Sequence, residues 1–211
     1  GREMGKWASQ VAWLRGDAME ADSWPEDVLG GASGVVSCVG AFGSHEAMRR
    51  VCGETNVAVM RAAKSRGVGR FAFISAHDFG PPIRQLLRGY FEGKYMAEDE
   101  LFRLYENGTG VSLRPGMIYG TRHVPLGDAA HVPLPLSLVG MPLRKILANQ
   151  QLRGCFFDKL PTFVSNAAVP PVSAEEVGLC AVSALLDPIT EDGASGRDVK
   201  SVWDIAGSSK T

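Results

Sequence analysis

The sequence predicts an α/β fold built on a parallel β-sheet. Three short apolar runs, at residues 34–40, 70–75 and 111–114, are rich in β-branched and aromatic residues. Two segments with apolar residues at helical spacing, 46–66 and 90–105, alternate with these runs. Continuous apolar runs that alternate with helices are typical of strands buried on both faces of a parallel sheet. At 211 residues the chain is long enough for one sizeable domain.

The N-terminal part is predicted to add one strand and one helix. Residues 11–14 alternate around Trp13 and are followed by Arg15-Gly16-Asp17, which indicates a short strand and a turn. We expect the helix at residues 24–29.

Polar, Gly and Pro residues mark the ends of the central helices. Ser44 is suited to cap the helix at 46–66, and Gly67-Val68-Gly69 ends it. Gly80-Pro81-Pro82 is predicted to break the chain before residues 83–89. Asn107-Gly108 ends the helix at 90–105, because both residue types tolerate the left-handed conformation of a helix C-terminus.

Two further elements are predicted near the C-terminus. Ser173-x-x-Glu176 has the spacing of a capping box, which predicts a helix over residues 174–186. A last strand is predicted at residues 201–205.

Composition excludes several classes of protein. The net charge is −1 and no basic stripe is present, which argues against nucleic acid as a partner. No apolar run reaches the length of a transmembrane helix. The four cysteines and four histidines show no metal-ligand spacing, so no metal site is predicted. Cys38 and Cys180 lie in apolar contexts and are expected to be buried free thiols, which favours a reducing compartment.

The pair Tyr90-x-x-x-Lys94 carries the clearest chemistry. A spacing of four places both side chains on one face of a helix, one turn apart. A nearby ammonium favours the phenolate, so we expect Lys94 to lower the pKa of Tyr90 and to make it a proton donor or acceptor. Glu98, four residues beyond Lys94, is expected to brace the lysine.

These residues form part of a longer pattern. Ser75 ends the strand before the helix, Arg114-Pro115-Gly116 follows the next strand, and the run VVSCVGAFG precedes both. The pattern resembles the extended or atypical branch of the short-chain dehydrogenase/reductase superfamily. It is most similar to NAD(P)-binding proteins of plant and algal plastids and to mitochondrial members tied to coenzyme Q synthesis. The resemblance implies a Rossmann-like, doubly wound parallel sheet.

The resemblance implies a role for each catalytic residue. Ser75 would orient the carbonyl of the substrate, Tyr90 would transfer the proton, and Lys94 would bind the ribose hydroxyls of the cofactor. A strand-end serine that merely caps the following loop is an equally good interpretation of Ser75.

The resemblance also implies cofactor contacts. Asp17 would lie beside the adenine, although a loop or cap aspartate explains the residue comparably well. Asn56 matches an asparagine of the family, but Cys52 stands where relatives carry another, which weakens the expected hydrogen-bonded relay. The remaining contacts are expected from the end of the 34–40 strand and from the hallmark turn: Val39, Gly40, Ala41, Pro115 and Gly116. For the first three, a glycine-rich exit turn is the alternative.

One part of the family pattern is missing. A dinucleotide fold opens with a strand, a glycine-rich turn and a helix that holds the pyrophosphate. The glycines at 30–34 precede a strand instead of following one, so they are better interpreted as a turn. We therefore expect a fragment that lacks the first strand–helix–strand unit. The implied cofactor is NAD or NADP, with NADP slightly favoured, and its binding depends on the absent loop.

Three regions are expected. Residues 1–122 form a partial NAD(P)-binding domain, 123–171 an irregular apolar region over the substrate, and 172–211 a helix and strand that return to the core. The apolar stretch 134–163 would meet a small apolar substrate, a membrane protein complex or, peripherally, a membrane surface.

Two functions remain open from the sequence. The first is an NAD(P)-dependent oxidoreductase acting on a lipid- or quinone-like carbonyl. The second is a non-catalytic accessory subunit of a photosynthetic or respiratory membrane complex that keeps the fold. The resemblance places either in the chloroplast, or alternatively in the mitochondrion.

Overall fold

The computed structural model describes residues 6–126, 130–135, 144, 145, 147, 169–186 and 198–207. Its centre is a parallel sheet with the order β1 (Val35–Ser37), β2 (Phe71–Ile74), β3 (Gly110–Leu113) and β8 (Asp198–Lys200). Two short sheets flank it: the parallel pair β4 (Ile118–Tyr119) and β7 (Val172–Ser173), and the antiparallel pair β5 (Thr121–Leu126) and β6 (Ala130–Pro135).

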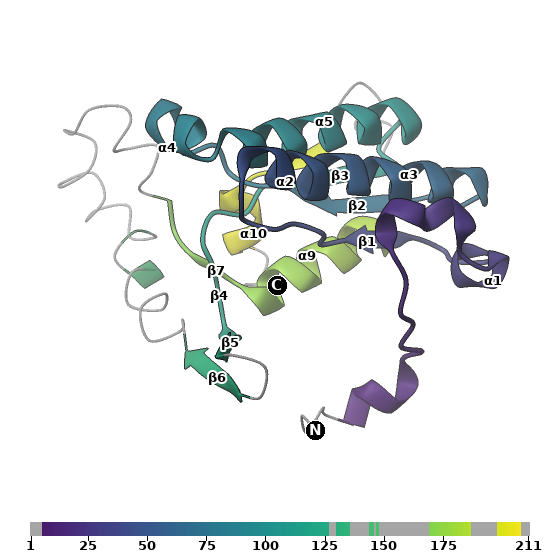
Figure 1. Cartoon of the computed structure of the whole chain (residues 1–211), viewed down its shortest axis with the longest axis horizontal. Coiled ribbons are helices and arrows are strands. Elements are labelled where there is room, and N and C mark those ends of the chain that lie inside the picture. Colours follow the sequence, from purple (N-terminus) through teal and green to yellow (C-terminus); the bar gives the residue numbers. More distant parts are fainter. Residues whose placement is uncertain are drawn as a thin grey trace.

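Helices cover both faces of the central sheet (Figure 1). α2 (His45–Arg49), α3 (Thr55–Ser65) and α5 (Arg88–Leu104) lie on one side, and α9 (Ala174–Leu186) and α10 (Val202–Gly207) lie on the other. The short helices are α1 (Glu26–Leu29), α4 (Pro81–Leu86) and the 3₁₀ turns η1 (Lys6–Gln10) and η2 (Ala18–Ser23). The predicted Rossmann-like, doubly wound parallel fold is thereby confirmed.

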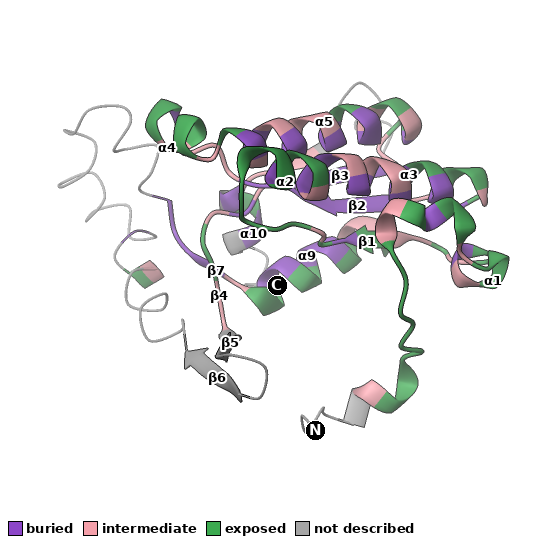
Figure 2. Cartoon of the chain, viewed as in Figure 1, coloured by how far each residue is buried: buried purple, intermediate pink, exposed green. Residues whose placement is uncertain are grey.

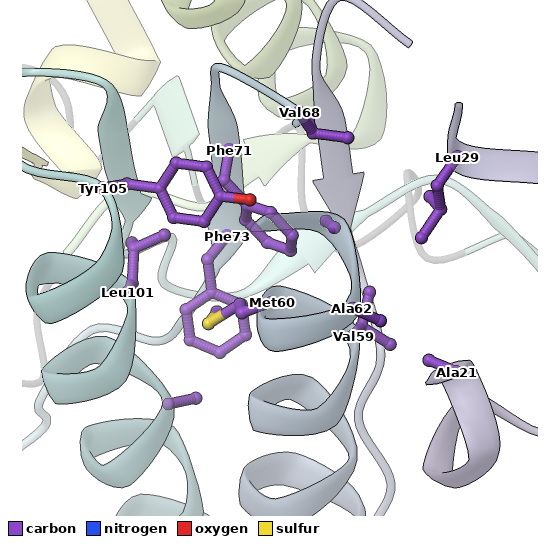
Figure 3. Packing of buried hydrophobic residues seen from close by; sticks show 12 residues of the cluster. Ala21, Leu29, Val59, Met60, Ala62, Val68, Phe71, Phe73, Leu101 and Tyr105 are labelled. Carbon is purple, nitrogen blue, oxygen red and sulfur yellow. The ribbon is translucent and has the colours of Figure 1, made fainter. Parts of the chain in front are cut away.

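The core has two halves, one on each face of the sheet. Phe71 and Phe73 of β2 point toward α3 and α5, where they pack with Met60, Leu101 and Tyr105 (Figure 3). The alternate residues of the same strand, Ala72 and Ile74, face the opposite way. They pack with a second cluster that includes Val111, Leu113, Val177, Val202 and Ile205. Strands buried on both faces explain why these segments are apolar throughout and not alternating (Figure 2).

β1 is the outer strand of the described sheet. It pairs with β2 on one side, and none of the described residues forms a strand on its other side. Val36 is 39% exposed, so the expectation that this strand is fully buried is wrong.

The predicted helix at 46–66 is confirmed, with one irregular turn. Ser44 caps it by accepting a hydrogen bond from the Ala47 amide at 3.2 Å. Residues Arg50–Glu54 then form a π-helical turn, in which the Thr55 amide donates to the Arg50 carbonyl five residues earlier. This turn lies against α5, where Gly53 meets Gly93 so closely that a Cβ on Gly53 would lie 2.8 Å from the Gly93 Cα.

The C-terminal capping box is also confirmed. The Ser173 amide donates to Glu176 Oε2 at 2.8 Å, and the Glu176 amide donates to Ser173 Oγ at 3.1 Å. Asn107 and Gly108 both have positive φ, as the end of the helix at 90–105 requires.

Two predicted strands are wrong. Residues 11–14 form no strand, because no strand of the described part of the chain lies beside them, and Trp13 and Leu14 are exposed. Residues Val202–Gly207 form α10, and the last strand is β8, just before them. The reason is a second capping box, in which the Ser201 amide donates to Asp204 Oδ2 at 2.7 Å.

Two other expectations need correction. Gly80-Pro81-Pro82 does not simply break the chain, since the two prolines open α4, where the missing amide protons cost nothing. The region 123–171 is not wholly irregular, because β5 and β6 form a hairpin. Most of the stretch 134–163 lies outside the described residues; within it, Arg144 forms an ion pair with Glu176.

Candidate functional site

A pocket of about 620 Å³ opens at the carboxyl ends of β1, β2 and β3. In parallel α/β sheets this edge is where ligands bind. The lining combines apolar walls with a few polar groups. It comprises Cys38, Gly40, Ala41, Phe42, Ile74, Ser75, Ala76, Phe79, Ile83, Leu87, Tyr90, Phe91, Lys94, Pro115, Gly116, Met117 and Ile118.

Most of the predicted site residues meet here. Ser75, Tyr90, Lys94, Pro115 and Gly116 all line the pocket. They meet because β2 and β3 end at the same edge and the first turns of α5 pass over it. Gly40 and Ala41 complete this set from the end of β1.

Lys94 is the most unusual group in the pocket. Its side chain comes from the buried face of α5, and the residue is only 4% exposed. The ammonium donates to the Ile74 carbonyl at 2.7 Å and to the Val39 carbonyl at 3.3 Å, and it lies 4.6 Å from the centre of the Phe73 ring. Burial lowers the pKa of Lys94 to about 8.

Glu98 does not brace Lys94 as predicted. Its carboxylate accepts hydrogen bonds from Arg114 Nε at 2.8 Å and from Ser112 Oγ at 2.6 Å, both on or next to β3. Burial alone would raise the pKa of Glu98, but the Arg114 guanidinium and the Ser112 hydroxyl hold it below its usual value. The guanidinium forms a paired contact that a flexible ammonium does not match.

Tyr90 also differs from expectation. Its ring stacks on Phe42 with centroids 5.1 Å apart and meets the edge of Phe91 at 5.4 Å. Burial between these rings raises the pKa of Tyr90 to about 12, with a smaller contribution from Cys52. The predicted lowering by Lys94 is therefore wrong, because the ammonium lies 5.8 Å from the ring centre and is directed at two carbonyls.

Ser75 presents a buried hydroxyl at the end of β2. The residue is 3% exposed, and its Oγ has no hydrogen-bond partner among the described residues. The hydroxyl lies near the Glu98 carboxylate and helps to lower the pKa of that group. The two groups do not meet the geometry of an ordinary hydrogen bond. Within the described part of the chain, Ser75 does not cap the following loop.

Asn56 lies behind the pocket and does not line it. Its Oδ1 accepts a hydrogen bond from Ser37 Oγ at 2.6 Å, and its Nδ2 donates to the Val39 carbonyl at 3.2 Å. The same Nδ2 donates to the Cys52 carbonyl at 2.9 Å, inside the π-helical turn. Asn56 and Lys94 thus share the Val39 carbonyl, which ties the π-helical turn to the pocket floor.

Asp17 is separate from this pocket. It caps η2 by accepting a hydrogen bond from the Met19 amide at 2.9 Å. It also borders a second hollow of about 580 Å³ next to the start of α2, together with Ser44 and Arg50. Asp17 is therefore a cap residue, but of η2 and not of the predicted helix at 24–29, and an adenine contact stays a prediction.

The thiols in the described part of the chain differ in exposure. Cys52 and Cys180 are buried, but Cys38 is exposed and borders the pocket, so the expectation that it is buried is wrong. In the described part of the chain no cluster of side chains could hold a metal ion. No helix there is long and apolar enough to cross a membrane.

Sequence reasoning missed three features of the site. Phe42 stacks on Tyr90, and Ile74 offers the carbonyl that Lys94 binds. Asp78, which accepts from Tyr95 at 3.1 Å and pairs with Arg84, anchors α4 at the rim. The sequence signals only the Phe42 contact, through the aromatic residue in the turn after β1. The roles of the Ile74 carbonyl and of Asp78 depend on tertiary contacts.

The chain is similar to two organellar proteins. It is 40% identical over 183 residues to the uncharacterized chloroplastic protein At1g32220 of Arabidopsis thaliana, covering 86% of this chain and 58% of that protein. It is 34% identical over 129 residues to the mitochondrial protein FMP52-2 of Scheffersomyces stipitis, covering 58% of this chain and 54% of that protein. The chain therefore spans less than two thirds of these relatives. No family profile matches it.

Two solved structures with a similar fold contain NAD. One is Bordetella bronchiseptica WbmH in complex with NAD+, at 18% identity and a TM-score of 0.49, covering 88% of this chain and 56% of the enzyme. Another is MoeE5 in complex with UDP-glucose and NAD, at 14% identity and a TM-score of 0.49, covering 89% and 61%.

Proposed function

We propose that this chain forms the nicotinamide and substrate half of an NAD(P)-dependent oxidoreductase that acts on a carbonyl or alcohol. The observation that carries the proposal is the buried Lys94 at the carboxyl edge of the sheet, beside Tyr90 and Ser75. An ammonium has three N–H donors, and the described residues accept only two of those of Lys94. The third is available to a ribose hydroxyl.

The residues present fit one half of a dinucleotide. Gly40 leaves room beside the Lys94 ammonium, where a Cβ would lie 3.5 Å from Nζ. The described residues contain no strand–turn–helix unit with the three-glycine spacing that holds a pyrophosphate; the turn after β1 has only Gly40 and Gly43 before α2. The nicotinamide, when bound, supplies or accepts the hydride.

The chain's own side chains would handle the proton and the substrate. A phenol with a pKa of about 12 stays protonated near neutral pH, so Tyr90 would act as the proton donor to a carbonyl oxygen. The unpartnered Ser75 hydroxyl would orient that oxygen. The apolar walls, which include Phe79, Ile83 and Met117, favour a lipid- or quinone-like compound.

The chloroplastic relative supports a plastid location for this chain, and the mitochondrial relative supports the alternative. NADP is the favoured dinucleotide on family resemblance alone.

Calorimetric titration with NADPH and NADH tests the proposal. It requires this chain and a longer protein in which a glycine-rich turn precedes it. We expect the longer protein to bind and Lys94→Ala to weaken binding, because the ribose loses its donor. Absence of binding in both proteins would reject the oxidoreductase and favour an accessory subunit.

A further inference from the structure

Lys94 has no carboxylate partner among the described residues. The carboxylate of α5 that faces it, Glu98, is engaged by Arg114. The nitrogen is bonded to its own carbon and directs two hydrogens at the Val39 and Ile74 carbonyls. The fourth tetrahedral position on this nitrogen is then unused. It carries a proton in the ammonium and a lone pair in the neutral amine.

That direction is open to the pocket. Lys94 is one of the lining residues, and Gly40 has no side chain to shield Nζ. Apart from Lys94, the lining includes no charged side chain within the described part of the chain. A small apolar molecule that enters the pocket would therefore meet an amine and not an ion pair.

The charge state of the amine is set by its surroundings. Burial lowers the pKa of Lys94, while Cys52, Cys38 and Glu98, which face it, act in the opposite direction. Tyr90 faces it as a neutral phenol. With a pKa of about 8, the neutral fraction at pH 7.5 is roughly two hundred times that of an ordinary lysine.

We propose that Lys94 is a reactive amine that captures small apolar aldehydes in this pocket as an imine. The nitrogen lone pair forms a bond to the carbonyl carbon, and the C=O π electrons move to the oxygen. A proton passes from nitrogen to that oxygen through solvent, giving a carbinolamine. A second proton then allows water to leave, the C=N bond forms, and the iminium returns one proton to solvent. No oxidant or reductant is consumed, and the capture needs no dinucleotide.

The test uses the 211-residue chain, benzaldehyde as the probe and sodium borohydride to trap the imine as a benzylamine. Peptide mass spectrometry then locates the label formed at about pH 7.5, where the neutral fraction of an ordinary lysine is small. Lys64 is the matched control, because it also lies over an aromatic ring, 4.7 Å from the centre of Tyr105, but is exposed. We expect Lys94 to be labelled at least roughly tenfold faster than Lys64, since far more of it is neutral.

Three variants distinguish capture by Lys94 from capture by the pocket thiol. Gly40→Ala should slow labelling of Lys94 with little change in melting temperature, because its methyl group would narrow the approach to Nζ. Cys38→Ser should leave labelling of Lys94 unchanged; loss of the Lys94 label in this variant would show that the thiol first holds the aldehyde as a hemithioacetal and would overturn the proposal. Lys94→Arg should abolish the label in the pocket.

The labelling map of the wild-type chain is decisive even where a variant does not fold. If the label follows exposure, with Lys94 unmodified and Lys64 modified, the proposal is wrong. The outcome is independent of the proposed oxidoreductase, because the reaction is run without NADPH. Added NADPH protects Lys94 in a dinucleotide-binding form of the protein only if that function is correct.

Discussion

At the scale of single residues, Lys94 combines a buried charge with an open approach. Buried lysines normally have a carboxylate partner, whereas this one is held by two backbone carbonyls at the ends of β1 and β2. Its charged form is therefore costly in the folded state. The same burial that costs stability makes the amine available for chemistry.

The first prediction concerns the pH dependence of stability. The pKa of Lys94 falls from 10.5 to about 8 on folding, so between these values the unfolded chain binds more protons than the folded chain. The free energy of unfolding should therefore rise with pH across this window, by up to roughly 3 kcal/mol from this one group. Urea unfolding of the wild type and of Lys94→Met at about pH 7 and pH 10 measures the effect as a difference. A difference that stays constant across the window would contradict the buried ammonium.

The second prediction concerns Tyr90. Replacement by Phe removes the proton donor but keeps the ring that stacks on Phe42, so turnover should be lost while the melting temperature changes little. Steady-state rates with NADPH and an apolar carbonyl substrate measure this in a dinucleotide-binding form of the protein. Phe42→Leu is the control, since it should alter KM more than kcat. Retained turnover in Tyr90→Phe would rule out the phenol as donor.

At this scale the sequence predicts which residues lie together in the site, but not which hydrogen bonds and ion pairs they form. Ser75, Tyr90 and Lys94 could be placed together because strand ends and helix spacing are visible in sequence. Their hydrogen-bond partners could not be predicted, since Arg114 reaches Glu98 only once β3 lies beside α5. The raised pKa of Tyr90 likewise depends on Phe42, which comes from a distant turn.

At the scale of elements, the contact between α5 and the π-helical turn sets the position of the site. A Cβ on Gly93 would lie 2.9 Å from the Gly53 amide nitrogen and 3.0 Å from the Arg49 carbonyl oxygen. The two backbones thus approach as closely as glycine allows, one residue before Lys94. Any side chain here would push α5 away from the π-helical turn.

The third prediction follows from this contact. Gly93→Ala should lower the free energy of unfolding by roughly 1–3 kcal/mol through overpacking, and it should weaken dinucleotide binding by moving Lys94. The control is Gly178→Ala in α9, where no atom lies within 4 Å of an added Cβ, and which should stabilise by up to about 1 kcal/mol. Urea titrations of both variants provide the comparison. Equal effects would show that helix propensity, and not close packing, governs position 93.

Long, well-capped elements were predictable, and short terminal ones were not. The helix that begins after Ser44 and the helix opened by Ser173 carry their caps in the sequence. Residues 11–14 alternate like a strand, but a strand also needs a neighbour with which to pair. The capping pair Ser201 and Asp204 was present in the sequence. Its preference for the start of a helix outweighs the strand propensity of the β-branched residue beside it.

At the scale of the whole molecule, a group of arginine–carboxylate pairs ties α5 to its neighbours. Arg114 joins Glu98 to the end of β3, and Arg61 joins Glu100 to α3. Arg103 and Arg61 lower the pKa of Glu100 to about 2, and that of Glu98 is lowered as well. These contacts lie on one side of the sheet, where α3 and α5 cover it (Figure 1).

The fourth prediction is the response of the whole molecule to acid. Groups whose pKa is lower in the folded state stabilise it above about pH 4.5, the pKa of an unfolded glutamate, and lose that contribution as the pH falls. The urea midpoint should therefore drop steeply below about pH 4.5. Glu98→Gln should lower the free energy of unfolding near pH 7 by roughly 2–4 kcal/mol and flatten this slope. Glu92→Gln is the matched comparison: its carboxylate is more exposed and pairs with Arg88, which lowers its pKa, so this variant should change both quantities in the same direction but by less.

The π-helical turn at Arg50–Glu54 has a consequence for how this chain compares with others. It accommodates one more residue than an α-helix of the same length would, and one residue is a rotation of about 100° around a helix axis. Loss of a single residue between 50 and 54 would restore a regular helix and turn every side chain before it, relative to those after it, by that angle. Asn56 could then keep facing Ser37 only if the Ser44 end of the helix turned by the same angle. A related protein whose sequence has a one-residue gap at this point is therefore expected to lack the π-helical turn and the hydrogen bonds that surround Asn56 here.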